Sequence, residues 1–216
     1  TVWTYYMEVQ AKLHDTTGFV TVRLNGVVIA EALNVDTKNA GTKTTFDTLR
    51  FSATGGSNSR FDDLYLMTGA GDAFLGEIQV ETLVPNGNGA VNQWMGSDGN
   101  QTDNYLLIDE IANINTADYV GSSVSGQQDL YQMTNLVAGS GRIVAVAHTA
   151  TSTKSDTESK PIRLLNRGNG VIKSDPREPT MGTYTNLSWL LTVNPETGAP
   201  FTVAEVNALQ SGVETV

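Results

Sequence analysis

The dipeptide Asn25-Gly26 places the tightest constraint on how this chain can fold. It stands between two runs rich in β-branched residues, which read FVTVRL and VVIAEAL. A two-residue Asn-Gly loop supplies the two positive φ angles that a type I′ turn requires, so the pattern predicts a β-hairpin. The hairpin sets Leu24 opposite Val27 and Val22 opposite Ile29, and we expect that apolar face to be a core face.

Other runs show the alternation of apolar and polar residues that is typical of strands with one buried face. In the segment 3–13, the alternate residues Trp3, Tyr5, Met7, Val9 and Ala11 are apolar. Turn signals rich in Gly, Asn and Ser recur every ~8–12 residues, which favours β-sandwiches. The other expected strands are residues 44–52, 60–67, 74–84, 127–136, 141–149 and 184–193.

One helix is expected, near 202–210. Thr202 and Glu205 have the spacing of a capping box, in which each side chain accepts a hydrogen bond from the backbone of the other. Three apolar side chains then share one face, namely Val203, Val206 and Leu209. We expect Gly212 to end the helix and residues 213–216 to add a last strand. Because a helix of about two turns is unstable alone, it should dock on a sheet.

The strongest break in the 216-residue chain is Pro85-Asn86-Gly87-Asn88-Gly89, a cluster of turn-forming residues. We therefore expect two domains, residues 1–84 and residues 85–216. The predicted fold class is all-β, with two tandem jelly-roll-like β-sandwich domains and the one short helix.

Composition narrows the classes of partner. The net charge is −10, and the 13 Lys and Arg residues are scattered along the chain, whereas a nucleic-acid groove needs a basic face. We therefore expect no nucleic-acid partner and read the acidity as an aid to solubility. No apolar run approaches ~18 residues, so no membrane span is expected. The chain has no Cys, so stability must come from core area or from assembly with other subunits.

The sequence carries none of the common catalytic motifs of metalloproteases, P-loop enzymes or serine hydrolases. His14 precedes a turn and is expected to be exposed, and His148 lies in an apolar run and is expected in the core or at an edge. Asp62 and Asp63 are adjacent in an expected strand, so their side chains point to opposite faces and cannot form a catalytic carboxylate pair by themselves. We expect no enzyme and no cofactor.

Two patterns suggest binding. The segment 98–109 partly resembles a calcium loop, although Asp stands where an EF-hand has Gly and Glu, at positions six and twelve. The candidate calcium ligands are Asp98, Asn100, Asp103 and Asp109. Trp94 follows a loop rich in Gly and Asn, and with Tyr105 it is a candidate platform for stacking on a sugar ring, although packing at a domain junction is the alternative for Trp94.

The order of several motifs resembles tailed-bacteriophage virion proteins that carry a concanavalin A-like or laminin-G-like sandwich. Those motifs are YYMEVQAKLHDTTGFVTVRLNGV, RFDDLYL, LGEIQVETLVPNGNG, Trp94, IDE, DYV and a final NPETGAPFTVAEVNALQSGVE. Together they span most of the chain. Phe201 replaces the Trp that is usual in the ending. The family's sandwich begins before the Trp3 region, so we expect residues 1–84 to lack its first strands.

The resemblance implies a structural virion protein: a capsid decoration, a head-fibre, or a tail or baseplate component on the virion's outer surface or tail. Its partners would be other virion proteins and further copies of itself, because weak contacts repeated in an assembly add up. The alternative is a carbohydrate-binding module that attaches the particle to a host-surface glycan. A glycan-cleaving enzyme is a third reading, which needs two carboxylates ~5–9 Å apart in a cleft.

Overall fold

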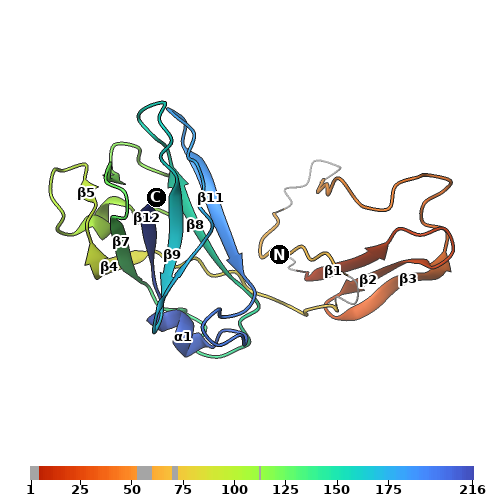
Figure 1. The fold of residues 1–216 in the computed structure, drawn as a ribbon. Helices are drawn as coiled ribbons and strands as arrows, with labels where there is room; N and C mark the ends of the chain where they lie inside the picture. The colour runs from red at the N-terminus through yellow and green to blue at the C-terminus, as the bar shows by residue number, and fades with distance from the viewer. Residues whose placement is uncertain (1–4, 53–59, 70–72, 112) are drawn as a thin grey trace. The chain divides into compact units, whose positions relative to one another are not determined.

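The computed structural model describes residues 5–52, 60–69, 73–111 and 113–216. The chain divides into two compact units, unit 1 (Thr1–Val80) and unit 2 (Glu81–Val216) (Figure 1). Strands are the main regular structure of both units, and the described residues hold one short α-helix and one 3₁₀ turn. The predicted all-β class is confirmed. No helix among the described residues is long and apolar enough to cross a membrane.

Unit 1 holds a three-stranded antiparallel sheet in the order β1-β2-β3. Its strands are β1 (Met7–Lys12), β2 (Gly18–Leu24) and β3 (Val27–Val35). The predicted Asn-Gly hairpin joins β2 to β3, with positive φ angles at Asn25 (50°) and Gly26 (79°). Leu24 pairs with Val27 as expected, but Val22 pairs with Ala30 because Ile29 is the extra residue of a β-bulge.

The rest of unit 1 differs from the expectation. The described residues of 44–52, 60–67 and 74–84 form no strands, although each run has the composition of one. In place of the expected sandwich, the described part of unit 1 has this single sheet and a long irregular segment after β3 (Figure 1). Aromatic and β-branched residues favour strands only where a partner strand is available, and these runs have none.

Unit 2 is built on a five-stranded antiparallel sheet in the order β10-β9-β12-β7-β4. Its strands are β4 (Pro85–Asn92), β7 (Gln128–Met133), β9 (Ile162–Arg167), β10 (Val171–Lys173) and β12 (Gln210–Thr215). The segment expected to break the chain at Pro85 thus begins an edge strand, which is bulged where it meets β7. The sequence patterns did not predict β9 and β10; β10 is the opposite edge strand, and β9 lies between it and β12.

The remaining elements of unit 2 are smaller. A second sheet pairs β8 (Val146–Ser152) with β11 (Thr185–Leu191), and a short ribbon pairs β5 (Met95–Gly96) with β6 (Val120–Gly121). A 3₁₀ turn, η1 (Asn104–Leu107), precedes β6, and α1 (Val203–Ala208) precedes β12. The sheet β8–β11 lies over the five-stranded sheet in a two-layer, sandwich-like arrangement (Figure 1).

All buried apolar side chains of the described residues lie in unit 2. One cluster joins the two layers, and a second lies beneath α1. The first contains Trp94, Ile162, Leu164, Leu187 and Val213, and the second contains Leu191, Phe201, Val206 and Leu209. Unit 2 therefore has a hydrophobic core of its own, whereas the described part of unit 1 has no buried apolar side chain.

The predicted capping box at the start of α1 is confirmed. The Thr202 hydroxyl accepts a hydrogen bond from the Glu205 backbone N–H at 3.2 Å, and the Glu205 carboxylate accepts one from the Thr202 N–H at 2.7 Å. Gly212 does not end the helix, which stops at Ala208 because Leu209 is already extended. Gly212 lies instead within β12, the central strand of the sheet. The expected last strand, residues 213–216, thus begins earlier, at Gln210.

Candidate functional site: an uncovered apolar sheet face

The two faces of the sheet β1–β2–β3 differ sharply in chemistry. Side chains of directly paired residues project from the same face, so the strand register sorts them. One face, here called the open face, carries Met7, Val9, Ala11, Val20, Val22, Leu24, Val27, Ala30 and Ala32. The other, here called the polar face, carries Glu8, Gln10, Lys12, Phe19, Thr21, Arg23, Val28, Glu31 and Leu33. Every ionisable residue of the paired register is therefore on the polar face.

The irregular segment of unit 1 packs against the β1–β2 part of the polar face, whereas the β3 residues of that face are exposed. The Glu8 carboxylate accepts hydrogen bonds from the Tyr65 hydroxyl at 2.6 Å and from the Gly76 N–H at 3.0 Å. The Arg23 guanidinium lies 3.9 Å from the centroid of the Phe74 ring, within the range of a cation–π contact. These contacts bury the carboxyl side chain of Glu8, and they fix which side of the sheet the segment occupies.

The pKa values of two tyrosines reflect the same packing of the segment against the polar face. Burial, followed by a hydrogen bond and charge repulsion from Tyr65, raises the pKa of the Tyr6 phenol well above its ordinary value. Burial, followed by the hydrogen bond to Glu8, raises the pKa of the Tyr65 phenol. Both shifts favour the neutral phenol, because a phenolate beside the Glu8 carboxylate would be a second negative charge in a poorly hydrated place.

The open face, in contrast, is not covered by the described residues of unit 1. None of its side chains is buried. The exposed fractions are 56% for Met7, 57% for Val9 and 66% for Val27. The prediction of an apolar face is correct, but the prediction that it lies in a core of this domain is wrong, because the following segment packs on the polar face instead.

In the predicted calcium loop, the polar side chains of Asp98 and Asn100 form hydrogen bonds within the loop itself. The Asn100 N–H and side-chain NH₂ donate to the two Asp98 carboxylate oxygens at 3.1 and 2.6 Å, and the Asn100 side-chain oxygen Oδ1 accepts from Thr102 N–H at 2.6 Å. Asp103 has a left-handed backbone (φ 60°) before η1, and Asp109 is exposed. No group of three or more metal-ligating side chains occurs among the described residues. The structure does not bring Asp98, Asn100, Asp103 and Asp109 together as a site.

Trp94 cannot serve as a sugar platform, because its side chain is only 8% exposed and belongs to the core of unit 2. Its indole N–H donates to the Gln127 carbonyl at 3.1 Å. Tyr105 is half-buried in η1 and forms no platform with Trp94. Stacking on a sugar requires an exposed ring, so the prediction for Trp94 is wrong.

A buried polar network explains why η1 lies beside β4 and β7. The Asp129 carboxylate accepts hydrogen bonds from Gln93 N–H at 3.0 Å, from the Asn104 amide at 2.8 Å and from the Tyr131 hydroxyl. Asn104 also donates to the Trp94 carbonyl at 3.0 Å. Burial raises the pKa of the Asp129 carboxyl, although these hydrogen bonds oppose the rise. Asp129 and Asn104 are fully enclosed, so the network acts in packing and not on a ligand.

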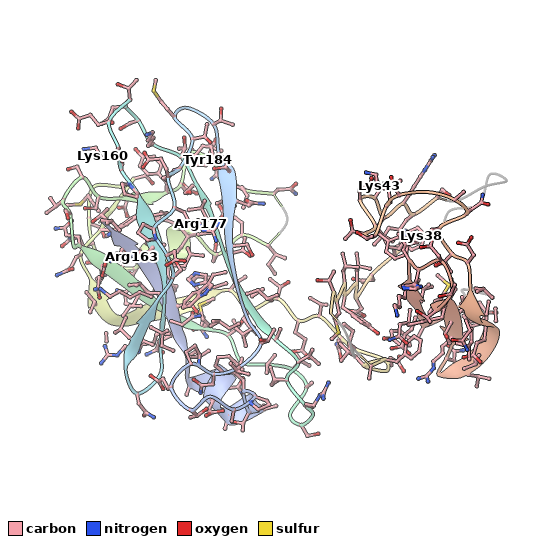
Figure 2. All side chains as sticks on the ribbon, turned by 45° about the vertical axis from the view of Figure 1, so that its right-hand side comes forward. Lys38, Lys43, Lys160, Arg163, Arg177 and Tyr184 are labelled. Carbon is pink, nitrogen blue, oxygen red and sulfur yellow. The ribbon has the colours of Figure 1, made fainter. Side chains whose placement is uncertain are left out.

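A second carboxylate is held by cations on the other face of the five-stranded sheet. Glu214 accepts hydrogen bonds from Arg163 at 3.3 Å and from Lys173 and Gln128. Figure 2 labels Arg163 among the side chains of unit 2. Burial alone would raise the pKa of the Glu214 carboxyl, but the hydrogen bonds from Lys173 and Gln128, the Lys173 charge and the Arg163 hydrogen bond hold it below its ordinary value. The group is neutralised locally and ties β9, β10 and β12 together.

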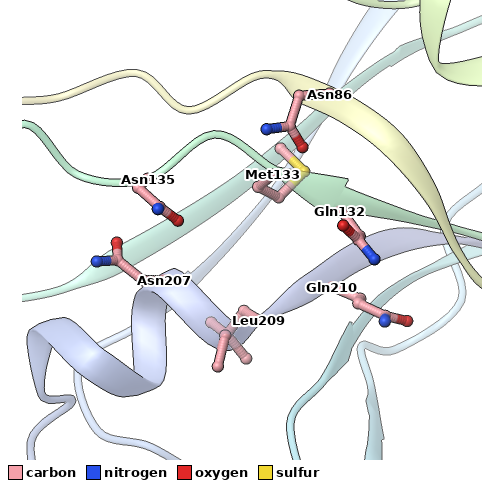
Figure 3. Close-up of a pocket in the computed structure, with 8 residues that line it drawn as sticks. Asn86, Gln132, Met133, Asn135, Asn207, Leu209 and Gln210 are labelled. Atoms are coloured by element: carbon pink, nitrogen blue, oxygen red, sulfur yellow. The ribbon is translucent and has the colours of Figure 1, made fainter.

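A pocket of about 370 Å³ lies where β4, β7, α1 and β12 meet (Figure 3). Five carboxamides line it, with Met133, Ala208 and Leu209 between them: Asn86, Gln132, Asn135, Asn207 and Gln210. Asn207 accepts a hydrogen bond from Leu136 N–H at 2.8 Å, and Gln210 accepts one from Ala90 N–H at 2.9 Å. Asn86, Gln132 and Asn135 are exposed, so their amides face solvent. The lining carries no charge.

Comparisons with protein families, curated proteins and solved structures find no match to this chain. Its function is therefore inferred from its own geometry. Sequence patterns identified the open face by its alternation, but they missed the carboxamide pocket, because its residues come from four elements that only the long-range strand order brings together.

Proposed function

We propose that this protein is a structural virion component, a capsid decoration, head-fibre or tail or baseplate protein, that acts through protein–protein contacts. The open face of unit 1 is the observation that carries this proposal. The order of motifs that resembles tailed-phage virion proteins gives the expected setting. On this reading the protein works as a contact surface and has no catalytic role.

The physical reason is the hydrophobic effect. Fully burying a Val, Leu or Met side chain gives about 1.5–3 kcal/mol, and the open face leaves six such side chains exposed or half-exposed. Contiguous apolar patches on soluble proteins mark contact sites for proteins or membranes. Because unit 1 buries no apolar side chain among its described residues, covering the open face would also stabilise it.

Incorporation into particles tests this proposal. Virions assembled with Val9→Lys protein should carry at least about tenfold less of it than virions assembled with the natural protein, because a charge cannot be buried unpaired in an apolar contact. The matched variant Lys12→Gln lies in the same strand on the polar face and should be retained. Quantitative mass spectrometry of purified particles measures both. Absence of the natural protein from particles, despite its expression, contradicts the proposal.

A second candidate function is carbohydrate binding, which the carboxamide pocket favours. An amide offers both a donor and an acceptor, so several amides together suit the hydroxyl groups of a neutral sugar. The ligand would be an uncharged host-surface glycan. Asn135→Ala and Gln132→Ala should each weaken binding about tenfold on a glycan array, as expected for the loss of one or two hydrogen bonds. Asn169→Ala, at an exposed turn elsewhere in unit 2, should not. A natural protein that binds no glycan rejects this candidate.

A further inference from the structure

The open face tapers from one end to the other. Its three rows across the strands are Met7–Leu24–Val27, then Val9–Val22–Ala30, then Ala11–Val20–Ala32. The first row holds three large side chains, and the last holds two alanines. The apolar layer is therefore thick at the turn that joins β2 to β3 and thin at the opposite end of the sheet.

A taper of this kind is complementary to itself under one symmetry operation. A two-fold axis that runs across the strands, along the middle row, turns a second copy face down with its strands reversed. Met7 then meets Ala11 of the second copy, and Val27 meets Ala32 of the second copy. Large side chains opposite small ones let two layers interdigitate at the ~10 Å spacing of stacked sheets.

We infer that the open face is covered by the same face of a second copy of this chain, so that the two sheets form one β-sandwich across a two-fold axis. This inference rests on the proposed function as a contact protein and names the contact. A two-fold interface uses the same patch on both subunits, so one self-complementary face is sufficient. The sandwich expected within residues 1–84 would then be completed between two chains.

The absence of charge on the open face also favours a second copy as its partner. The open face has no ionisable side chain, so stacking two copies buries no charge. A partner drawn by charge would be attracted elsewhere on this acidic chain. Each copy has a net charge of −10, so the copies repel one another at low salt. Added salt screens that repulsion and leaves the apolar contact intact, so the dimer should become tighter as ionic strength rises.

The size of the face sets the expected strength. Three strands about 4.8 Å apart and about 20 Å long give roughly 300 Å². Stable complexes bury about 800 Å² per partner, so the face by itself supports a weak dimer. A weak contact is effective where copies are held at high local concentration, as in a repeating assembly. An unrelated monomeric partner held by this face alone would dissociate.

Sedimentation of the purified full chain over a range of concentrations tests the inference. We expect a reversible monomer–dimer equilibrium that salt strengthens. Val9→Lys should weaken dimerisation at least about tenfold, since it places like charges on the axis. Lys12→Gln should leave it unchanged. Circular dichroism of each variant checks that the fold is retained.

Cross-linking gives a geometric test, because the chain has no cysteine of its own. Val9 lies on the middle row and faces Val9 of the second copy, so Val9→Cys protein should cross-link to itself through a short bis-maleimide. Met7→Cys and Ala11→Cys proteins should each cross-link poorly alone and well when mixed. Lys12→Cys protein, on the polar face, should not cross-link.

The outcomes separate the inference from the proposed function. A chain that stays monomeric, with Val9→Cys reactive towards a maleimide, overturns the second-copy inference but leaves incorporation into particles as the test of the proposed function. A monomer in which Val9→Cys is protected shows that the chain covers its own open face, and this overturns both. Dimers in which Lys12→Cys cross-links and Val9→Cys does not overturn the inference alone.

Discussion

His148 is a half-buried residue at which acid should destabilise the protein. It lies in β8 opposite Trp189, with a buried Nδ1 that has no hydrogen-bond partner among the described residues. Burial lowers the pKa of its imidazole from 6.5 to about 4. Between these two values the unfolded chain binds a proton and the folded chain does not, so stability is full above the unfolded pKa and falls as the pH drops towards 4.

Urea unfolding of unit 2 measures this effect. The natural protein should lose about 2 kcal/mol between about pH 7 and about pH 5 through this group. His148→Leu should remove that loss, whereas His14→Gln, which changes the exposed histidine in unit 1, should keep it. An unchanged pH dependence in His148→Leu would show that the acid sensitivity arises elsewhere.

Gly212 is a residue at which a single methyl group should be intolerable. A Cβ built there would lie 1.9 Å from the Asp129 carbonyl oxygen, which belongs to the neighbouring strand. The backbones of β12 and β7 would have to separate in the middle of the sheet. Gly212→Ala should therefore cost at least about 3 kcal/mol in denaturant unfolding, the upper range for overpacking. Gly121→Ala is the control, because a Cβ there meets no atom within 4 Å.

At the scale of elements, α1 depends on its N-terminal cap. Glu205 also accepts a hydrogen bond from the Asn194 amide at 3.1 Å, so the capping box is tied to the loop that leads into the helix. Thr202→Ala should lower the free energy of unfolding by about 1 kcal/mol, because it leaves a helix N–H without its acceptor. Thr202→Ser keeps the hydroxyl and should cost much less. Equal losses in the two variants would show that packing, not capping, is responsible.

The elements that sequence patterns predicted are those whose cause is local. The Asn25-Gly26 turn needs only two residues, and the Thr202 cap needs only four. Strand pairing is different. β12 lies between β7 and β9, both of which are distant from it in sequence, and the residues around Gly212 carry no pattern that predicts this pairing. The aromatic run around Phe46 and Phe51 looks like a strand by composition but finds no partner.

The candidate site likewise could be predicted from sequence only where its cause is local. Alternation along β1 and β2 predicted an apolar face, because side-chain direction is a local property of a strand. Which face is covered depended on Tyr65 and Phe74, which lie more than forty residues away and meet Glu8 and Arg23. Long-range contacts of this kind leave no signal in the local pattern.

At the scale of the whole molecule, the two units should differ in stability. Unit 2 has two core clusters, whereas the described part of unit 1 buries no apolar side chain. Limited proteolysis of the free chain should therefore cut first between residues 36 and 80 and leave a resistant fragment that begins near Glu81. Equal rates of cleavage in the two units would contradict this difference, and protection of the first unit on self-association would link it to the open face.

The central place of β12 also governs when the molecule can fold during synthesis. Residues Gln210–Thr215 are the last strand of unit 2 in chain order, yet they pair with β7 on one side and β9 on the other. A nascent chain that still lacks them has two half-sheets with facing unpaired edges. The five-stranded sheet of unit 2 therefore closes only after this strand has left the ribosome. Until then, its unpaired edges avoid pairing with other chains only if the delay is short or if a chaperone covers them.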